Sequence, residues 1–307
     1  MDLTSTKIAT NNTAIVGVYG ATGSGKTLCL ATALNLGNMI YCLMPGEGDG
    51  SATLRDYNIP MLNINSYGEL IGLYAALKGN PDYRGDETDM PIMKPFKGEK
   101  PISKFPNPEN IKQIMGKFKG LDIKTIAFDA GQGLQQLFSN HSIEFWGKDV
   151  GIGRYGDIAD LTRSTLLKFS TIPGIKMVVW VAFDKQVVDE GRNMVYREMA
   201  FEGNKSREIV PPACNFVLPI FTGEELGIDA EKREWEWKWN GVTEKRDRFF
   251  LLRPARGFWA KARGAMSINA PAICRADLAV LYNKFYGVNP PTEKPETKTT
   301  KETKETK

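Results

Sequence analysis

The sequence predicts an α/β fold with a mostly parallel central sheet flanked by helices. Through residue 183, short apolar β-rich runs alternate with helical segments, and this alternation is typical of strand–helix–strand units with right-handed crossovers. The first strand also ends in a glycine-rich turn that leads directly into a helix. Beyond residue 183 the chain becomes β-rich, and we expect a C-terminal β-hairpin region there.

Hydrophobic periodicity and turn residues place the elements in order along the chain. The helix at 26–37 is expected to stop at Gly37, because glycine commonly ends helices. Asn240–Gly241 favours a type I′ hairpin turn. The expected strands are 13–20, 38–44, 123–129 and 175–183, the expected helices are 26–37, 66–80, 157–174 and 270–287, and the expected hairpin is 234–252.

Three tryptophans, Trp235, Trp237 and Trp239, alternate along the first strand of this hairpin. Aromatic residues at a period of two are ordinary sheet core. We therefore favour a packed hairpin face over a platform for stacking bases.

The chain divides by composition into one core and three irregular parts. Residues 1–12 are polar and expected to be flexible, and 13–287 form one core. Residues 80–118 are rich in proline and lysine with little periodicity, which predicts a surface insertion. The tail at 288–307 has mixed charge and no large apolar residues after Val288, so we expect it to be disordered.

Composition limits the possible functions. The 307 residues carry a formal charge of only +4, which permits an anionic partner without requiring one. One histidine and four cysteines without a C-x-x-C pair argue against a zinc site. No apolar run approaches the ~18 residues of a membrane span. We expect a cytoplasmic protein with reduced thiols and no membrane contact.

The stretch "GATGSGKT" is a complete G-x-x-x-x-G-K-[ST] motif between a strand and a helix. Its glycines allow successive backbone N–H groups to face a bound phosphate, and the helix N-terminus adds a favourable dipole. Lysine there reaches the β- and γ-phosphates, and the threonine hydroxyl faces Mg²⁺. The predicted ATP-binding residues are Gly20, Ala21, Thr22, Gly23, Ser24, Gly25, Lys26 and Thr27. A purely structural glycine-rich turn is the alternative.

Asp129 follows the apolar strand in "TIAFDA". At the carboxyl end of a strand, its carboxylate is predicted to hold Mg²⁺ together with Thr27. Because many strands end in aspartate, this prediction depends on the glycine-rich motif before it.

These motifs resemble the RecA/KaiC branch of P-loop ATPases, and more narrowly the phage-encoded single-strand annealing ATPases of the Sak group. The resemblance spans about residues 14 to 264. It rests on "GATGSGKT", "MPGEGDG", "TIAFDAGQGL", "RYGDIADLTRSTLLKF", "GIKMVVWVAFDKQVVDEG", "REIVPPACNFVLPI" and "GFWAKARG". The chain departs from the family at Ala130, where members carry Ser or Thr, and the γ-phosphate sensor among Asp184, Lys185 and Gln186 stays unassigned.

The resemblance implies three further catalytic residues. Glu47, in the glycine-rich loop after the second strand, corresponds to the base that polarises the attacking water, with Asp49 and a plain surface acid as alternatives. Lys261 and Arg263 form a K-x-R pair whose side chains leave a strand on the same side. In RecA-like assemblies such a pair reaches the ATP of the neighbouring subunit as an arginine finger does, so we expect a homo-oligomer, a ring or a filament. A solvated basic strand edge is the alternative.

The resemblance also places DNA-binding loops at about 139–157 and 186–210. Cations there neutralise phosphates and aromatic rings stack on unpaired bases. The predicted nucleic-acid residues are Trp146, Lys148, Arg154, Arg192, Lys205 and Arg207. Surface loops of mixed charge are the alternative.

Together these predictions describe an ATPase that binds single-stranded DNA and assists annealing or strand exchange in phage recombination or replication. A single-strand-binding protein is a possible partner of such an enzyme. Three other functions stay open: a duplex-DNA motor or packaging ATPase, an ATP-dependent switch, and a small-molecule phosphotransferase. The tryptophan hairpin is a poor match for the arginine-rich lid of a nucleotide kinase.

Overall fold

The computed structural model describes residues 13–46, 50–83, 85–86, 108–146, 153–189, 191, 193–263 and 271–286. Its strands are β1 (Ala14–Tyr19), β2 (Asn38–Leu43), β3 (Met61–Asn63), β4 (Ile123–Asp129), β5 (Met177–Ala182), β6 (Asp184–Asp189), β7 (Met194–Met199), β8 (Phe216–Thr222), β9 (Trp235–Trp239), β10 (Val242–Arg246), β11 (Arg248–Leu251), β12 (Lys261–Ala262) and β13 (Ile273–Arg275). Its helices are α1 (Lys26–Leu30), α2 (Tyr67–Leu77), α3 (Pro108–Phe118), α4 (Gly131–Trp146), α5 (Gly153–Ser170), α6 (Gly203–Ala213), α7 (Ala230–Arg233) and α8 (Leu278–Tyr286), with 3₁₀ helices η1 (Ala31–Leu36) and η2 (Gly50–Tyr57).

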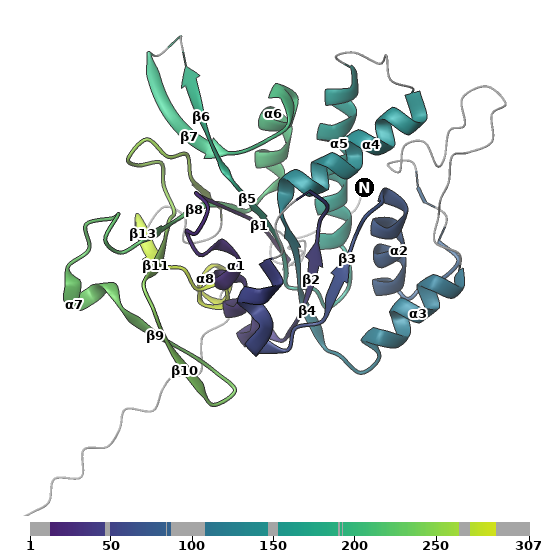
Figure 1. The fold of residues 1–307 in the computed structure, drawn as a ribbon, viewed down its shortest axis with the longest axis horizontal. Coiled ribbons are helices and arrows are strands. Elements are labelled where there is room, and N and C mark those ends of the chain that lie inside the picture. The colour runs from purple at the N-terminus through teal and green to yellow at the C-terminus, as the bar shows by residue number, and fades with distance from the viewer. Residues whose placement is uncertain are drawn as a thin grey trace, which may run out of the picture.

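The central sheet has the strand order β13-β11-β8-β1-β5-β4-β2-β3, and β12 pairs with β8. The six strands from β8 to β3 run parallel, whereas β11, β12 and β13 join antiparallel at one side. Helices cover the sheet on both sides (Figure 1). The predicted α/β class with a mostly parallel sheet is therefore confirmed.

Two hydrophobic cores lie on opposite faces of the sheet, because alternate residues of each strand point to opposite faces. Val16 and Val18 of β1 pack in the core formed with α1, η1, η2, α8 and the C-terminal strands. Ile15 and Tyr19 pack in the other core, with α2, α4, α5 and α6. Figure 1 shows α2, α4 and α5 on one side of the sheet and α1 with α8 on the other.

Two β-hairpins extend from the central sheet. The β9–β10 hairpin turns at Asn240 and Gly241, with φ values of 45° and 81°, as the type I′ prediction requires. The predicted packed face is confirmed as well, since Trp235 and Trp237 are buried in the core. The β6–β7 hairpin extends at the top of the view in Figure 1, whereas the β9–β10 hairpin extends at the bottom.

Several element predictions need correction. The predicted 26–37 helix is α1 followed by the 3₁₀ helix η1, although Gly37 does end it, with φ of 135°. The last residues of the 80–118 insertion form α3, which buries Ile111 beside α2. The predicted helix at 270–287 is a short edge strand, β13, followed by α8. The tail at 288–307 and residues 1–12 lie outside the described residues.

Candidate functional site

The glycine-rich motif forms the turn between β1 and α1. Gly23 and Gly25 have φ values of 78° and 88°, a left-handed conformation that glycine adopts without steric cost. Lys26 is almost fully buried, and its ammonium donates hydrogen bonds to the carbonyl oxygens of Gly20, at 2.8 Å, and Ala21, at 2.7 Å. The turn therefore already curls around the lysine charge.

The metal-binding candidates meet beside this turn. The Thr27 hydroxyl donates to Asp129 Oδ2 at 2.7 Å, although the two residues are 102 positions apart in the chain. Asp129 is the last residue of β4, and the peptide bond that follows it is cis. The phenol of Tyr41, from β2, donates to the same oxygen at 3.0 Å. Three elements thus converge on one carboxylate.

Sheet topology explains this convergence. β1 and β4 are both paired in parallel with β5, with Tyr19 opposite Ala182 and Asp129 opposite Val181. The carboxyl ends of parallel strands lie at one edge of a sheet, where α/β proteins commonly bind ligands. Phe183, just past β5, places its ring 4.8 Å from the Lys26 ammonium. β5 lies between β1 and β4 and so separates the glycine-rich turn from Asp129. The Thr27 side chain spans this separation by its hydrogen bond to Asp129.

The residues present fit a magnesium ion. The Thr27 hydroxyl donates a hydrogen bond to Asp129, so the lone pairs of its oxygen stay open to a cation. Hydroxyl and carboxylate oxygens are ligands that Mg²⁺ prefers. Burial raises the pKa of Asp129 above its ordinary value, while the hydrogen bonds from Thr27 and Tyr41 and the charge of Lys26 oppose that rise. A bound cation would stabilise the charged carboxylate in the same way.

The predicted base Glu47 and its alternative Asp49 lie outside the described residues. Gly50, the first described residue after them, lies against the metal-binding candidates. A Cβ at Gly50 would be 3.2 Å from Asp129 Oδ2, 3.2 Å from Thr27 Cγ2 and 2.9 Å from the Tyr41 hydroxyl. The chain therefore returns to this site where η2 begins.

The K-x-R pair lies away from the chain's own glycine-rich turn. Lys261 pairs with Val217, which is level with Gly17 in the middle of β1, and the chain then runs toward the amino ends of the parallel strands. Both side chains reach the last carbonyls of α6. Lys261 donates to Pro211 and Arg263 donates to Pro212, the latter at 3.1 Å. The two cations do share one side, as expected of a K-x-R strand.

Lys261 is half-buried, and its surroundings disfavour its charge. Desolvation, aided by the nearby Arg263 cation, lowers the pKa of Lys261 to about 8.

The two segments predicted as DNA-binding loops are mostly helix and hairpin rather than loops where the structure describes them, which corrects their predicted conformation but leaves DNA binding a prediction. Residues 139–146 continue α4, and α5 begins at Gly153. The second segment contains the β6–β7 hairpin and most of α6. Helical and hairpin hydrogen bonding satisfies these backbones, which the scattered glycines and charges did not reveal.

Three of the six predicted nucleic-acid residues can be placed. Arg154, at the start of α5, lies over the ring of Tyr155. Lys205 is exposed on α6 and pairs with Glu208 at 3.6 Å. Arg207, on the same helix, forms an ion pair with Glu198 of β7. The Trp146 side chain, Lys148 and Arg192 lie outside the described residues.

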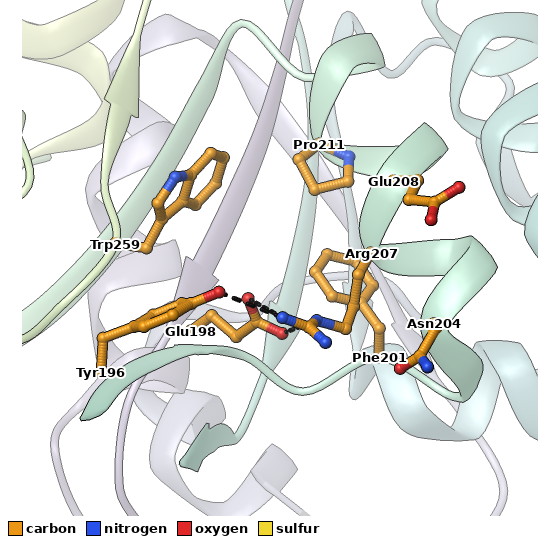
Figure 2. Close-up of a pocket in the computed structure, with 8 residues that line it drawn as sticks. All are labelled: Tyr196, Glu198, Phe201, Asn204, Arg207, Glu208, Pro211 and Trp259. Carbon is orange, nitrogen blue, oxygen red and sulfur yellow. Dashed lines mark hydrogen bonds and ion pairs between the residues drawn. The ribbon is translucent and has the colours of Figure 1, made fainter. Parts of the chain in front are cut away.

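Arg207 lies in a pocket of about 420 Å³ between β7 and α6 (Figure 2). Its guanidinium donates to the Tyr196 hydroxyl at 3.1 Å and to Glu198 Oε2 at 3.4 Å. Trp259 stands on the opposite side of the pocket from Arg207, and Asn204 lies at its rim (Figure 2). Aromatic walls with a few polar groups are typical of small-ligand sites, although Glu198 offsets the charge of Arg207.

Several residues of the nucleotide-site candidate were not predicted from the sequence. Tyr41 sits in an apolar run that reads only as a buried strand, and nothing in that run indicates that its hydroxyl faces Asp129. Arg248, from β11, donates through Nε to the Ser24 carbonyl at 2.8 Å. Both contacts join distant parts of the chain, so local sequence carries no signal for them.

Comparison with known proteins gives little further information. No protein-family model matches the chain, and no curated protein matches it. Among solved structures, it is similar to the crystal structure of the RadB recombinase, with a TM-score of 0.28 and 11% sequence identity over 81% of this chain and 90% of that one. A score this low supports no conclusion about function.

Within the described ranges, every helix is too short or too polar to cross a bilayer.

Proposed function

We propose that this chain is a RecA-like P-loop ATPase of the kind that the Sak group represents. The observation that carries the proposal is the hydrogen bond from Thr27, in the glycine-rich turn, to Asp129, 102 positions further along the chain. A glycine-rich turn with a purely structural role would not need a carboxylate from a distant strand beside its threonine. The pairing of hydroxyl and carboxylate beside a buried lysine fits a metal–triphosphate complex.

Each residue has a role in this proposal. Backbone N–H groups of the turn and the start of α1 bind phosphate oxygens. Lys26, now bound to the Gly20 and Ala21 carbonyls, exchanges these partners for phosphate oxygens. Thr27 and Asp129 would hold Mg²⁺, which would offset negative charge on the transferring phosphoryl group. Glu47 is proposed as the base that orients the attacking water.

We also propose that a neighbouring copy supplies Lys261 and Arg263. Lys261 lies level with Gly17, in the middle of β1, and Arg263 lies nearer the amino ends of the parallel strands. Neither residue is at the carboxyl edge of the sheet, and this placement supports a role in a neighbouring copy. Cations at this position cannot reach the chain's own glycine-rich turn, whereas a second copy packed against α6 can place its turn beside them. ATP then stabilises an oligomer, because its pocket is completed by two chains.

Single-stranded DNA is the proposed polymer substrate. Support comes from the pocket of Figure 2, where Tyr196 and Trp259 offer rings for stacking beside the ion pair of Arg207 with Glu198. Arg154 and Lys205 add positive charge on α5 and α6. Annealing or strand exchange in a phage replication or recombination system is the activity consistent with both sites.

Nucleotide binding is the first test. A fluorescent ATP analogue, titrated with protein in Mg²⁺, is expected to bind wild-type protein and to lose affinity at least about tenfold in Lys26→Ala. Removing Mg²⁺ with a chelator is expected to weaken binding to wild-type protein much more than to Asp129→Asn. Absence of any adenine-nucleotide affinity in wild-type protein would overturn the proposal.

The second test separates the oligomeric, DNA-dependent enzyme from other ATPases. ATP turnover per mole of protein is expected to rise with protein concentration and with added single-stranded oligonucleotide. Duplex stimulation without single-strand preference would favour a DNA motor, and tight ATP binding without turnover would favour a switch. Constant turnover down to monomeric dilution would contradict the shared pocket while leaving the cradle intact.

A further inference from the structure

Two arginines from the C-terminal strands contact the glycine-rich turn and the helix that follows it. Arg248, the first residue of β11, donates through Nε to the Ser24 carbonyl at 2.8 Å. Arg246, the last residue of β10, donates through Nη1 to the Leu28 carbonyl at 2.9 Å. The bonds join residues 224 and 218 positions apart. Hydrogen bonds from the C-terminal strands thus hold the backbone of the turn and of α1 in place.

The bond to Ser24 fixes the direction of a peptide group. The Ser24–Gly25 peptide is planar and trans, so its C=O and its N–H point in opposite directions. Since the carbonyl of Ser24 faces Arg248, the N–H of Gly25 faces away from Arg248. Backbone N–H groups that point inward are what a phosphate-binding turn requires.

Packing at Gly25 shows that Arg248 is fitted closely to the turn. A Cβ at Gly25 would lie 2.8 Å from Arg248 Nε and 3.2 Å from its Cδ. The φ of Gly25, 88°, also requires glycine. Glycine at this position therefore permits both the curl of the turn and the approach of the guanidinium.

Arg248 is held in place by its own surroundings. Its backbone pairs with Thr222 of β8, and its carbonyl accepts a hydrogen bond from Trp235 Nε1 at 3.1 Å. Its guanidinium forms an ion pair with Asp247, and a quarter of the side chain is exposed. A side chain fixed at both ends loses little freedom when it bonds the turn, so the bond contributes to order in the cradle.

We propose that Arg248 is a positioning residue for phosphate binding, which it serves by orienting the Ser24–Gly25 peptide. This inference rests on the proposed nucleotide site. Arg248 acts through the backbone and does not touch the γ-phosphate. Its effect is therefore the same for nucleoside diphosphates and triphosphates, which both fill the centre of the cradle.

The test compares Arg248→Ala, Arg248→Lys and wild type in the full chain, with affinities for ADP and ATP measured in Mg²⁺. Arg248→Ala is expected to weaken both affinities about tenfold, equal to about 1.4 kcal/mol. Arg248→Lys is expected to recover part of the loss, because its ammonium can still donate to the Ser24 carbonyl. Arg163→Ala, an exposed arginine on α5 at the other face of the sheet, serves as the control and is expected to bind like wild type.

Unfolding midpoints without nucleotide are measured for the same proteins. Equal loss for ADP and ATP, with the midpoint of Arg248→Lys unchanged, supports positioning of the turn. Wild-type affinities in Arg248→Ala would overturn the inference and leave the proposed function standing. A loss confined to ATP would also overturn it, since it would place the guanidinium on the γ-phosphate. Wild-type protein that binds neither nucleotide would remove the proposed function itself.

Discussion

Replacement of Arg246 by alanine is expected to destabilise the whole fold. The Arg246 side chain is only 4% exposed and forms an ion pair with Glu244 at 2.8 Å. It also donates to the Tyr57 hydroxyl at 3.0 Å and lies 4.2 Å from the ring of Trp237. The variant loses these contacts together with the bond to Leu28 described above.

The expected loss in the free energy of unfolding follows from the unpaired Glu244 carboxylate that Arg246→Ala would leave. Removing one partner of a buried pair costs about 3–5 kcal/mol. Because Glu244 is 30% exposed and regains some hydration, we expect the lower end of that range, about 3 kcal/mol. A domain has a free energy of unfolding of about 5–15 kcal/mol, so this loss is a large share of the total.

Urea denaturation followed by tryptophan fluorescence and circular dichroism measures the change. Lys245→Ala is the matched control, since Lys245 is the adjacent residue on the same strand and its side chain is 74% exposed. The control is expected to stay within about 0.5 kcal/mol of wild type. In the double variant with Glu244→Gln, part of the loss is expected to be recovered, because the unpaired carboxylate is gone.

A change below about 0.5 kcal/mol for Arg246→Ala would show that the buried ion pair and its hydrogen bonds contribute little to stability. It would mean that the β9–β10 hairpin packs on α1 through its tryptophans alone. Additive effects of Arg246→Ala and Glu244→Ala would likewise refute the claim that the two side chains form a coupled pair.

Three further outcomes are expected. Thr27→Val keeps the shape of the side chain but is expected to reduce the gain in ATP affinity on adding Mg²⁺ at least about tenfold, as binding titrations would show; an unchanged gain would exclude the hydroxyl as a ligand. The pKa of Lys261 is lowered from 10.5 to about 8. Between these two pH values the unfolded chain binds a proton that the folded chain does not, so stability is expected to rise with pH there. Lys261→Met should flatten this rise, measured by urea titrations at several pH values, and an identical slope would contradict the lowered pKa. Gly133→Ala is expected to lower the unfolding midpoint, because its Cβ would lie 2.4 Å from the Pro45 carbonyl, whereas Gly116→Ala in open space on α3 should raise it slightly; the same sign for both would refute the packing argument.

Much of the fold was predictable because its signals are local. Alternating apolar runs identified β1, β2, β4 and β5, and Asn240–Gly241 identified the hairpin turn. Some local signals were present but missed. Pro108 and Glu109 open α3, and Asp277 caps α8 through the backbone N–H of Val280 at 3.0 Å. The strand β13 just before that cap was read as part of the helix because its three residues are too few to show a period.

The glycine-rich turn with Lys26 and Thr27 could be found from local sequence, because close backbone turns need glycine at set positions and the whole motif spans eight residues. Asp129 was indicated by its place after an apolar strand. Which side chains meet beside the turn depends instead on the three-dimensional arrangement of the strands. Tyr41, Gly50 and Arg248 reach the site because parallel pairing and the C-terminal strands bring distant segments to one sheet edge. Such contacts depend on strand order and register, which no local pattern of residues encodes.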